Sequence, residues 1–318
     1  MDTSTHVITG VGLGGLSFID PTMVNHPELL TSMFFCTIVG SNAPDIDFLY
    51  KYKGNDTYVK MHRGMSHSLI AQVLLALSIA SLATLANGGL FFTTFFFWTL
   101  LAVIVHVLFD ICNIYGTQAF RPITHKWFAL NILPIFDPFI MSLHVVGIAL
   151  WLVGFHSGLV FIIIYIAIVL YILLRFIIHQ SVLKQTTIES EPGATYTLIP
   201  SFRLNHWGVI ASYNQQYKLG KFEKNSVVWS KVLMKASEKN EIIRASRKHS
   251  FVHYLMLHST HLHANIINHK DGYEVHWFDL RYQSKIDEPF IAIIKLDKKL
   301  NLIESNVKRG LISAPERV

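Results

Sequence analysis

The sequence predicts a polytopic membrane protein, with an all-α helical bundle over residues 1–180 and a soluble α+β domain after it. Mean hydropathy is +0.38, and only 15% of the residues are charged, whereas soluble domains carry about a quarter. The deficit lies in the first half, because residues 181–318 hold 20 of the 27 basic side chains. The first half is therefore suited to a membrane, and the second half is suited to water.

Four segments are apolar enough to cross a bilayer, which takes about 20 helical residues. Turns without Lys or Arg, at 87–89 and 154–157, join them into two hairpins. Two shorter apolar stretches precede them and fit a transmembrane hairpin, a re-entrant pair or an amphipathic pair, so six helices is the preferred count. The four spans are 68–86, 90–111, 139–153 and 158–174, and the shorter stretches are 7–19 and 29–43.

The basic residues near the spans all fall on the side opposite those turns. The positive-inside rule makes that side cytoplasmic, so we expect the C-terminal domain in the cytoplasm. This placement also explains the net charge of +6, which therefore does not indicate nucleic-acid binding. The residues are Lys51, Lys53, Lys60, Arg63, Arg121, Lys126, Arg175 and Lys184.

Histidines and aspartates gather at the predicted cytoplasmic ends of the apolar segments. Ionisable groups at such positions are costly to desolvate and usually pair, bind a metal or line a water-filled path. A helix places the last two candidates, which are four residues apart, on one face. The candidate ligands are His6, Asp45, Asp47, His62, His67, His106 and Asp110.

These side chains predict a metal site with hydrolytic chemistry. Imidazoles and carboxylates are the mixed nitrogen and oxygen donors that suit Zn²⁺, with Mn²⁺ or Fe²⁺ as alternatives. Seven donors exceed one tetrahedral site, so we expect one or two ions. A metal-activated water would attack a phosphoryl or acyl centre, with Asp47 as base and Arg63 binding an anionic substrate group.

Each part of this set also has a plainer interpretation. The two aspartates fit a cap or a turn after Pro44, the histidines near residue 65 fit contacts with lipid headgroups, and the helical pair fits a structural contact. Convergence at one membrane depth favours a metal site. The remaining histidines have no such pattern, and we interpret them as structural or solvated. They include His144, His156, His179, His258, His261, His263, His269 and His276.

Two further patterns in the membrane half receive structural interpretations. The glycines between Gly10 and Gly15 follow no strand and precede no Lys-Ser/Thr pair, so close helix packing explains them better than a phosphate loop. Asp137, before Pro138, is interpreted as a turn residue, with a role near the site as the alternative. Asn113 fits a turn, a ligand or a group that orients one.

Four motifs together resemble the YdjM-like family of bacterial inner-membrane, metal-dependent hydrolases, and are most similar to its YfhP-like branch. The resemblance covers about residues 1–180, is most specific in the third motif, and extends in that branch to a C-terminal segment with 277–282. It implies a multi-pass inner-membrane protein with a hydrolytic metal site. The motifs are Asp2-x-x-x-His6-x-x-x-Gly10, Pro44-Asp45-x-Asp47, His62-Arg63-Gly64-x-Ser66-His67-Ser68 and His106-x-x-x-Asp110-x-x-Asn113-x-Tyr115-Gly116-Thr117.

A weaker similarity to zinc-dependent phospholipases C and nucleases lies in the order His, Asp, His and His-x-x-x-Asp. The chain lacks the later His-x-x-x-Glu and the N-terminal ligand of that family, so one or two ions fit better than three. This similarity implies a phosphoester substrate, lipid phosphoesters included, because the site would lie at headgroup level.

Residues 194–318 are expected to form the cytoplasmic α+β domain, after a linker at 181–193. Alternating apolar residues predict strands at 206–213, 273–282 and 289–296, and 241–257 predicts a helix. Membrane lipids are the expected partners, and protein partners are unknown. The rival hypothesis is a non-catalytic metal-binding membrane protein, which would be a sensor, a scaffold or a transporter, although the apolar span centres argue against transport.

Overall fold

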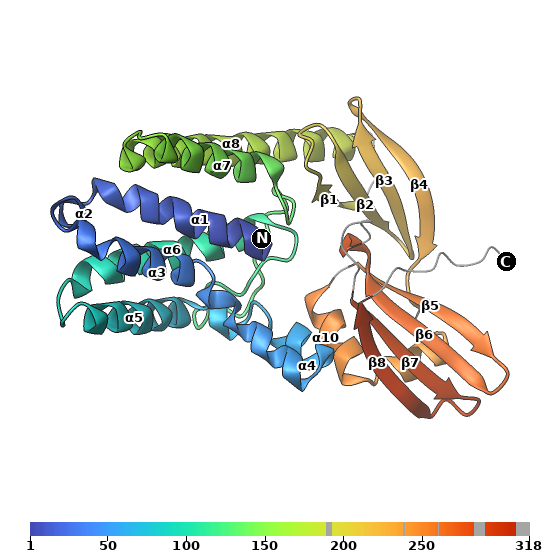
Figure 1. Cartoon of the computed structure of the whole chain (residues 1–318). Helices are drawn as coiled ribbons and strands as arrows, with labels where there is room; N and C mark the ends of the chain where they lie inside the picture. The colour runs from blue at the N-terminus through green and yellow to red at the C-terminus, as the bar shows by residue number, and fades with distance from the viewer. Residues whose placement is uncertain (189–192, 238, 260, 283–289, 310–318) are drawn as a thin grey trace. The chain divides into compact units, whose positions relative to one another are not determined.

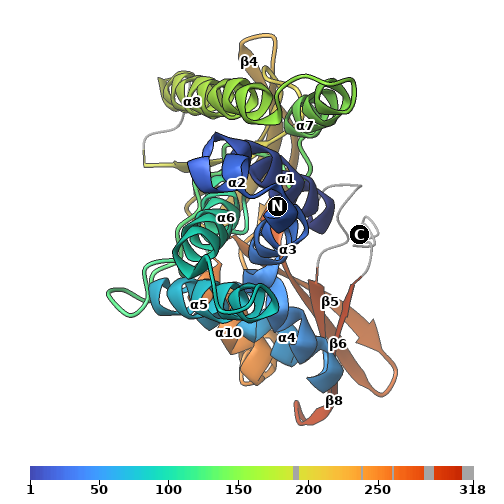
Figure 2. The ribbon, with the colours of Figure 1, turned by 60° about the vertical axis from the view of Figure 1, so that its left-hand side comes forward.

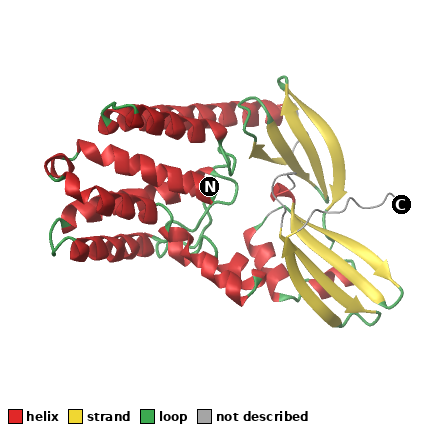
Figure 3. Ribbon diagram, in the orientation of Figure 1, coloured by secondary structure: helices red, strands yellow, loops and turns green. Residues whose placement is uncertain are grey.

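The computed structural model describes residues 1–188, 193–237, 239–259, 261–282 and 290–309. The chain divides into two compact units. The helical unit contains residues 1–49, 61–180 and 200–204, and the C-terminal unit contains 50–60, 181–199 and 205–318. Helices dominate the first unit, and strands dominate the second (Figures 1 and 3).

The first two apolar stretches form a pair of short helices. Asp2 caps the first of them by accepting a hydrogen bond from the Thr5 backbone nitrogen. Neither helix reaches the length of about 20 residues that a crossing requires. The elements are α1 (Thr3–Leu16), η1 (Ser17–Ile19), α2 (Pro21–Asn25), η2 (Pro27–Leu29) and α3 (Leu30–Gly40).

Glycines let these helices approach closely, as predicted. A Cβ atom on Gly10 would lie 2.6 Å from the Ile38 Cα atom of α3. In α3, a Cβ atom on Gly40 would lie 3.1 Å from the Thr99 carbonyl oxygen of the neighbouring long helix. Because small residues bring helix backbones together, the end of α3 is held against both neighbours.

Three helices in the described part of the chain are long and apolar enough to cross a membrane, whereas the sequence predicts four spans. The exception is α7, whose 15 residues rise about 22 Å, against the roughly 30 Å of a bilayer core. Helix α8 continues through residues 181–188 of the predicted linker, and 189–192 lie outside the described residues. The three long helices are α5 (Leu69–Ala86), α6 (Phe92–Cys112) and α8 (Ser157–Ile188), and α7 is Pro138–Leu152.

Within the helical unit, α1 packs between α3 and α7, and α6 packs against both α3 and α5 (Figures 1 and 2). One apolar cluster fills the space around α7 and α8 and includes Ile140 and Phe161. A second joins α3, α5 and α6 through Met33, Ala80 and Phe95. Short elements connect α3 to α5, namely η3 (Ala43–Lys53), α4 (Asn55–Met61) and η4 (Met65–His67).

The C-terminal unit contains two four-stranded antiparallel sheets in sequential order, which confirms the α+β fold class. The predicted helix at 241–257 is two helices, because the chain turns at 247–249 and His249 caps the second. Residues of both sheets share one apolar cluster that includes Tyr217 and Phe278. The elements are β1 (Thr195–Pro200), β2 (Trp207–Tyr213), β3 (Gln216–Glu223), β4 (Ser226–Met234), α9 (Glu241–Ser246), α10 (Ser250–His258), β5 (Leu262–His269), β6 (Gly272–Asp279), η5 (Leu280–Tyr282), β7 (Phe290–Asp297) and β8 (Leu302–Arg309).

Candidate metal site

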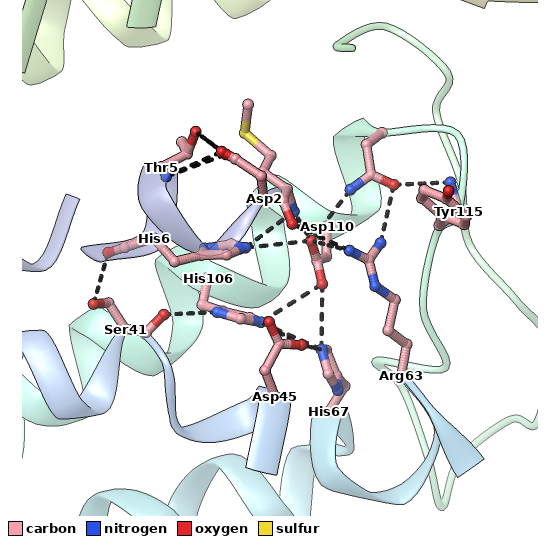
Figure 4. A network of polar contacts seen from close by, with 12 residues as sticks. Asp2, Thr5, His6, Ser41, Asp45, Arg63, His67, His106, Asp110 and Tyr115 are labelled. Carbon is pink, nitrogen blue, oxygen red and sulfur yellow. Dashed lines mark hydrogen bonds and ion pairs between the residues drawn. The ribbon is translucent and has the colours of Figure 1, made fainter. Parts of the chain in front are cut away.

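Four of the predicted ligands come together in the helical unit (Figure 4). Asp45 lies in η3, His67 ends η4 directly before α5, and His106 and Asp110 lie one turn apart near the end of α6. One ligand atom of each lies within 4.8 Å of the others. We call these four residues the metal cluster. Its members are buried, except that Asp45 keeps 24% of its side-chain surface exposed.

The separations within the metal cluster suit a small divalent ion. The Nε2 atom of His67 lies 3.2 Å from Asp110 Oδ2 and 3.3 Å from His106 Nε2. His106 Nε2 lies 3.5 Å from Asp110 Oδ2, and Asp45 Oδ1 lies 3.7 Å from both imidazoles. Bonds of about 2.0–2.1 Å to a tetrahedral ion put neighbouring ligand atoms about 3.3–3.4 Å apart.

Hydrogen bonding fixes which nitrogen of His106 faces the cluster. Its Nδ1 atom lies 2.7 Å from the backbone carbonyl oxygen of Ser41, which can only accept a hydrogen bond. Nδ1 therefore carries the proton and donates. Nε2 therefore faces the cluster, where it offers a lone pair to a metal ion. The hydrogen bond to Ser41 holds the ring in place, as such bonds do in many metal sites.

The same assignment follows for His67. Burial lowers the pKa of its imidazole, which is therefore neutral near pH 7. Its Nδ1 atom lies 3.0 Å from the Ser66 hydroxyl, and that hydroxyl donates to Asp47 Oδ2 at 2.8 Å. Because the hydroxyl has one proton, it accepts from His67 Nδ1. The lone pair of His67 Nε2 therefore also points into the cluster.

The groups that face one another in the metal cluster are all hydrogen-bond acceptors. Two imidazole lone pairs and two carboxylate oxygens converge, and Asp45 Oδ1 has no hydrogen-bond partner among the described residues. Buried acceptors that face one another without a donor are strongly unfavourable. A divalent cation resolves this conflict, so the donor chemistry of these residues fits a bound metal.

Asp47, predicted as a ligand and a base, is occupied by other hydrogen bonds. It accepts from the backbone nitrogen of Arg63 at 2.8 Å, from Ser66, and from His62 Nδ1 at 2.7 Å. Burial alone would raise the pKa of Asp47, but the interactions with His62 and the other donors lower it overall. Asp47 therefore acts on the cluster indirectly, by orienting His67 through Ser66.

A second set of possible ligands consists of Asp45, Asp47 and His62. The Asp47–His62 hydrogen bond uses two of its three ligand groups, so a second ion would have to replace that bond. One ion in the metal cluster therefore fits this structure better than two.

Arg63, predicted to bind an anionic substrate group, is buried beside Asp110. Its side chain is 6% exposed, and its guanidinium contacts Asp110 Oδ1 and Asn113 Oδ1, both at 3.1 Å. Its φ angle is 61°, a left-handed conformation that is uncommon for residues with a side chain. Hydrogen bonds from Gln118 and Thr117 to its carbonyl oxygen hold that conformation. Arg63 thus balances the charge of Asp110 and fixes its position.

His6 lies beside the metal cluster. Its ring stacks on that of His106 with centroids 3.7 Å apart, and its Nε2 atom lies 3.6 Å from Asp110 Oδ1. The Met1 backbone nitrogen contacts both His6 Nε2, at 3.0 Å, and Asp110 Oδ1. Arg63 contacts the same oxygen of Asp110, so a positive group already lies beside the oxygen that His6 approaches.

Two contributors to the site were not predicted, namely the Ser41 carbonyl and the Ser66 hydroxyl. The Ser41 carbonyl gives no signal in the sequence, because any residue supplies that group. The Ser66 hydroxyl could have been identified from its place between Arg63 and His67 in one motif. Asn113, for which the sequence left a turn, a ligand and an orienting role open, accepts a hydrogen bond from Arg63 and donates one to Asp110 at 3.2 Å.

Histidines outside the site have other contacts. His144 Nδ1 donates to the Ile140 carbonyl of its own helix at 2.8 Å, which fits its structural interpretation. In the C-terminal unit, His276 pairs with Glu274 at 2.5 Å, and His263 Nδ1 lies 3.0 Å from the Met234 carbonyl. Asp137, as predicted, has a turn role, because it caps α7.

Comparison with known proteins places this chain in a family. The family model described as YdjM inner membrane protein matches residues 1–182, and that of the YfhP C-terminal alpha/beta plait domain matches residues 241–311. The chain is 33% identical over 308 residues to the uncharacterized protein YfhP of Bacillus subtilis (strain 168), covering 96% of this chain and 94% of that protein. No solved structure matches the chain. The chain therefore belongs to the YdjM inner membrane protein family and also carries the YfhP C-terminal domain.

Proposed function

We propose that this membrane protein is a metal-dependent hydrolase with one divalent ion, zinc in the first instance, in the metal cluster. The observation that carries the proposal is the inward orientation of two imidazole lone pairs towards two carboxylate oxygens. His67, His106, Asp45 and Asp110 would hold the ion. Two nitrogen and two oxygen donors suit Zn²⁺, Mn²⁺ or Fe²⁺. Such an ion, when bound, lowers the pKa of water towards about 7 and polarises ester oxygens.

Other side chains orient the ligands and balance their charge. Ser66 and Asp47 fix the tautomer of His67, and Ser41 fixes that of His106. Arg63 offsets the negative charge of Asp110 inside the bundle. Asp45 is the most exposed member of the cluster, so a substrate would approach from its side.

A lipid phosphoester is the substrate class that the surroundings favour. His67 is followed by the span α5, and Asp110 lies in the last turn of the span α6, so the site lies at a membrane boundary. Near Asp45 in η3, Ile46 and Phe48 are about half exposed, at 50% and 49%. Exposed apolar side chains at a membrane boundary fit contact with acyl chains.

One observation favours the rival, a non-catalytic metal site. Three of the four cluster residues have no exposed surface, as is common for structural ions, which are closed to solvent. The two functions differ in the effect of metal removal. Removal from an enzyme abolishes turnover, whereas removal from a structural site lowers stability without any turnover to lose.

The test is hydrolysis of phosphatidic acid and phosphatidylglycerol in detergent micelles by the purified full-length chain, with p-nitrophenyl phosphate as the water-soluble comparison. We expect zinc-dependent turnover of a lipid substrate that is lost in Asp45→Asn and His106→Ala. The matched control is His144→Ala, which removes another buried histidine outside the cluster. Lack of metal-dependent turnover with all three substrates, or turnover that His106→Ala leaves intact, would contradict the proposal.

A further inference from the structure

The segment that joins α6 to α7 carries positive charge and no negative charge of its own. Residues 111–136 contain Arg121 and Lys126 but no acidic residue. The two acids that flank the segment, Asp110 and Asp137, are fully buried. Lys126 is exposed and Arg121 is half-buried, so the surface of this segment is positive.

A backbone hydrogen bond fixes Arg121 at the depth where the span α5 begins. The nitrogen of Leu69, the first residue of α5, donates to the Arg121 carbonyl at 3.1 Å. The 18 residues of α5 rise about 27 Å, close to the roughly 30 Å of a bilayer core. The ends of this helix therefore lie near the lipid headgroups, and Arg121 lies at the same level.

The guanidinium of Arg121 is held by Gln118 and contacts no carboxylate among the described residues. Its Nη1 atom donates to Gln118 Oε1 at 3.1 Å, and the Gln118 amide nitrogen donates to the His125 carbonyl at 2.7 Å. Gln118 is buried, and its backbone nitrogen donates to the Arg63 carbonyl at 3.0 Å. A positioned guanidinium without an acidic partner is suited to bind phosphate oxygens by charge-assisted hydrogen bonds.

Exposed apolar side chains accompany this cation. Phe120 and Ile123 flank Arg121 in the chain, and Ile123 is 80% exposed. At the start of α5, Leu69 and Ile70 are exposed as well. Exposed apolar groups at the membrane boundary fit acyl chains, whereas a free phosphate ion would leave them uncovered. A cation beside apolar side chains at this depth matches the two parts of a phospholipid.

We infer that Arg121 is the centre of a binding site for an anionic phospholipid. Its guanidinium binds the lipid phosphate, and Lys126 adds a second positive charge that favours a lipid with net negative charge. The acyl chains lie against Ile123 and the exposed side of α5. Arg121 thus takes the anion-binding role that the sequence predicted for Arg63, whose charge is balanced by Asp110. The site does not rest on the hydrolase proposal.

The test is native mass spectrometry of the purified full-length chain in detergent with a chelator, titrated with dioleoyl phosphatidylglycerol or dioleoyl phosphatidylcholine. The acyl chains of the two lipids are identical, but only the first lipid has a net negative charge. We expect phosphatidylglycerol to bind about fivefold more tightly or more, because one cation near a membrane surface contributes about that factor. Arg121→Gln should remove most of this preference, and Lys126→Gln should lower it to a smaller extent.

Three controls separate this site from other anion-binding groups. Arg244→Gln removes an exposed arginine of α9 that already pairs with Glu241 at 3.4 Å, and His67→Ala disrupts the metal cluster. Both variants should keep the preference for phosphatidylglycerol. Glycerol 3-phosphate, which has a phosphate but no acyl chains, should not displace the lipid at equal concentration.

Four results would each overturn the proposal. They are equal binding of the two lipids to the unaltered chain, a preference that neither Arg121→Gln nor Lys126→Gln lowers, loss of the preference in His67→Ala, and displacement of the lipid by equimolar glycerol 3-phosphate. Among the described residues, the Arg121 side chain donates one hydrogen bond, to Gln118, and Lys126 is exposed. Both variants are therefore expected to fold.

Discussion

The helical unit contains two buried polar networks, and only one of them has the composition of a metal site. The first is the metal cluster. The second, which we call the capping network, consists of Asp137, Tyr171 and Arg175. Both join segments distant in the chain, and their members are buried except for Asp45, whose side chain keeps 24% of its surface exposed. They differ in the balance between donors and acceptors.

In the capping network, donors and acceptors alternate. Asp137 accepts from two backbone nitrogens of α7 and from the Tyr171 hydroxyl at 2.8 Å. Arg175 donates to the Ile132 carbonyl at 2.7 Å and to the Ser201 carbonyl at 3.0 Å. In the metal cluster, four acceptors face one another. Buried polarity alone therefore does not identify a site, whereas a surplus of buried acceptors does.

Loss of a cluster ligand should have the largest effect. We expect His67→Ala and Asp110→Ala to lose bound zinc, as measured by mass spectrometry of the metal content after loading and dialysis. Each removes one of four bonds and leaves the remaining acceptors uncompensated. Tyr171→Phe, a change in the capping network, should keep the full zinc content. Equal zinc content in the unaltered chain and both ligand variants would remove the distinction between the networks.

A change that orients a ligand should have a smaller effect. Ser66→Ala breaks the connection between His67 and Asp47 while it leaves all four ligand atoms in place. Partners that orient metal-bound imidazoles contribute about 10–100-fold to affinity. We therefore expect a zinc dissociation constant raised by that factor in a competition titration with a chelator. Ser78→Ala, an exposed serine of α5, is the matched control, and an unchanged constant in Ser66→Ala would refute the orienting role.

A substitution in the capping network should lower the stability of the protein instead. Tyr171→Phe leaves Asp137 Oδ2 without the hydroxyl donor at 2.8 Å. A buried acceptor that loses its donor costs about 1–3 kcal/mol. We expect the denaturant midpoint of the helical unit to fall accordingly. If Tyr171→Phe lost zinc but kept its stability, the roles assigned to the two networks would be reversed.

The pH dependence of the metal-free protein should show the smallest effect. Burial lowers the pKa of His67 in the folded state, so the unfolded chain binds a proton at a higher pH than the folded one. The stability due to His67 is therefore complete above the unfolded pKa of about 6.5 and is lost as pH falls below it. Zinc should oppose this loss, since it occupies the neutral imidazole. In His67→Gln the pH dependence should weaken, and a slope identical to that of the unaltered chain would contradict the assignment.

The sequence predicted which residue types meet, because helix periodicity and membrane depth are local properties. His106 and Asp110 share a face at a spacing of four residues, as expected for a helix. Convergence of His67 and Asp45 with that pair followed from the topology. The sequence also predicted the two-part organisation from charge alone.

The roles of the residues within the set required the folded structure. Asp47 has the side chain of a base, but in the structure its carboxylate accepts hydrogen bonds from His62 and Ser66. Arg63 has the side chain of an anion-binding group, but its guanidinium contacts Asp110. Such directions depend on backbone angles and hydrogen-bond partners from distant segments. The length of α7, by contrast, was predicted closely, because the helix Pro138–Leu152 lies within one residue of the expected span 139–153.

X-ray absorption at the zinc edge of the loaded, full-length protein tests the central claim most directly. The account predicts a shell of two imidazole nitrogens and two oxygens at about 2.0–2.2 Å, with no sulfur at about 2.3 Å. Asp45→Asn should alter the oxygen part of the shell and leave both imidazoles. A spectrum with sulfur ligands, or one without two imidazoles, would contradict the assignment of the metal cluster.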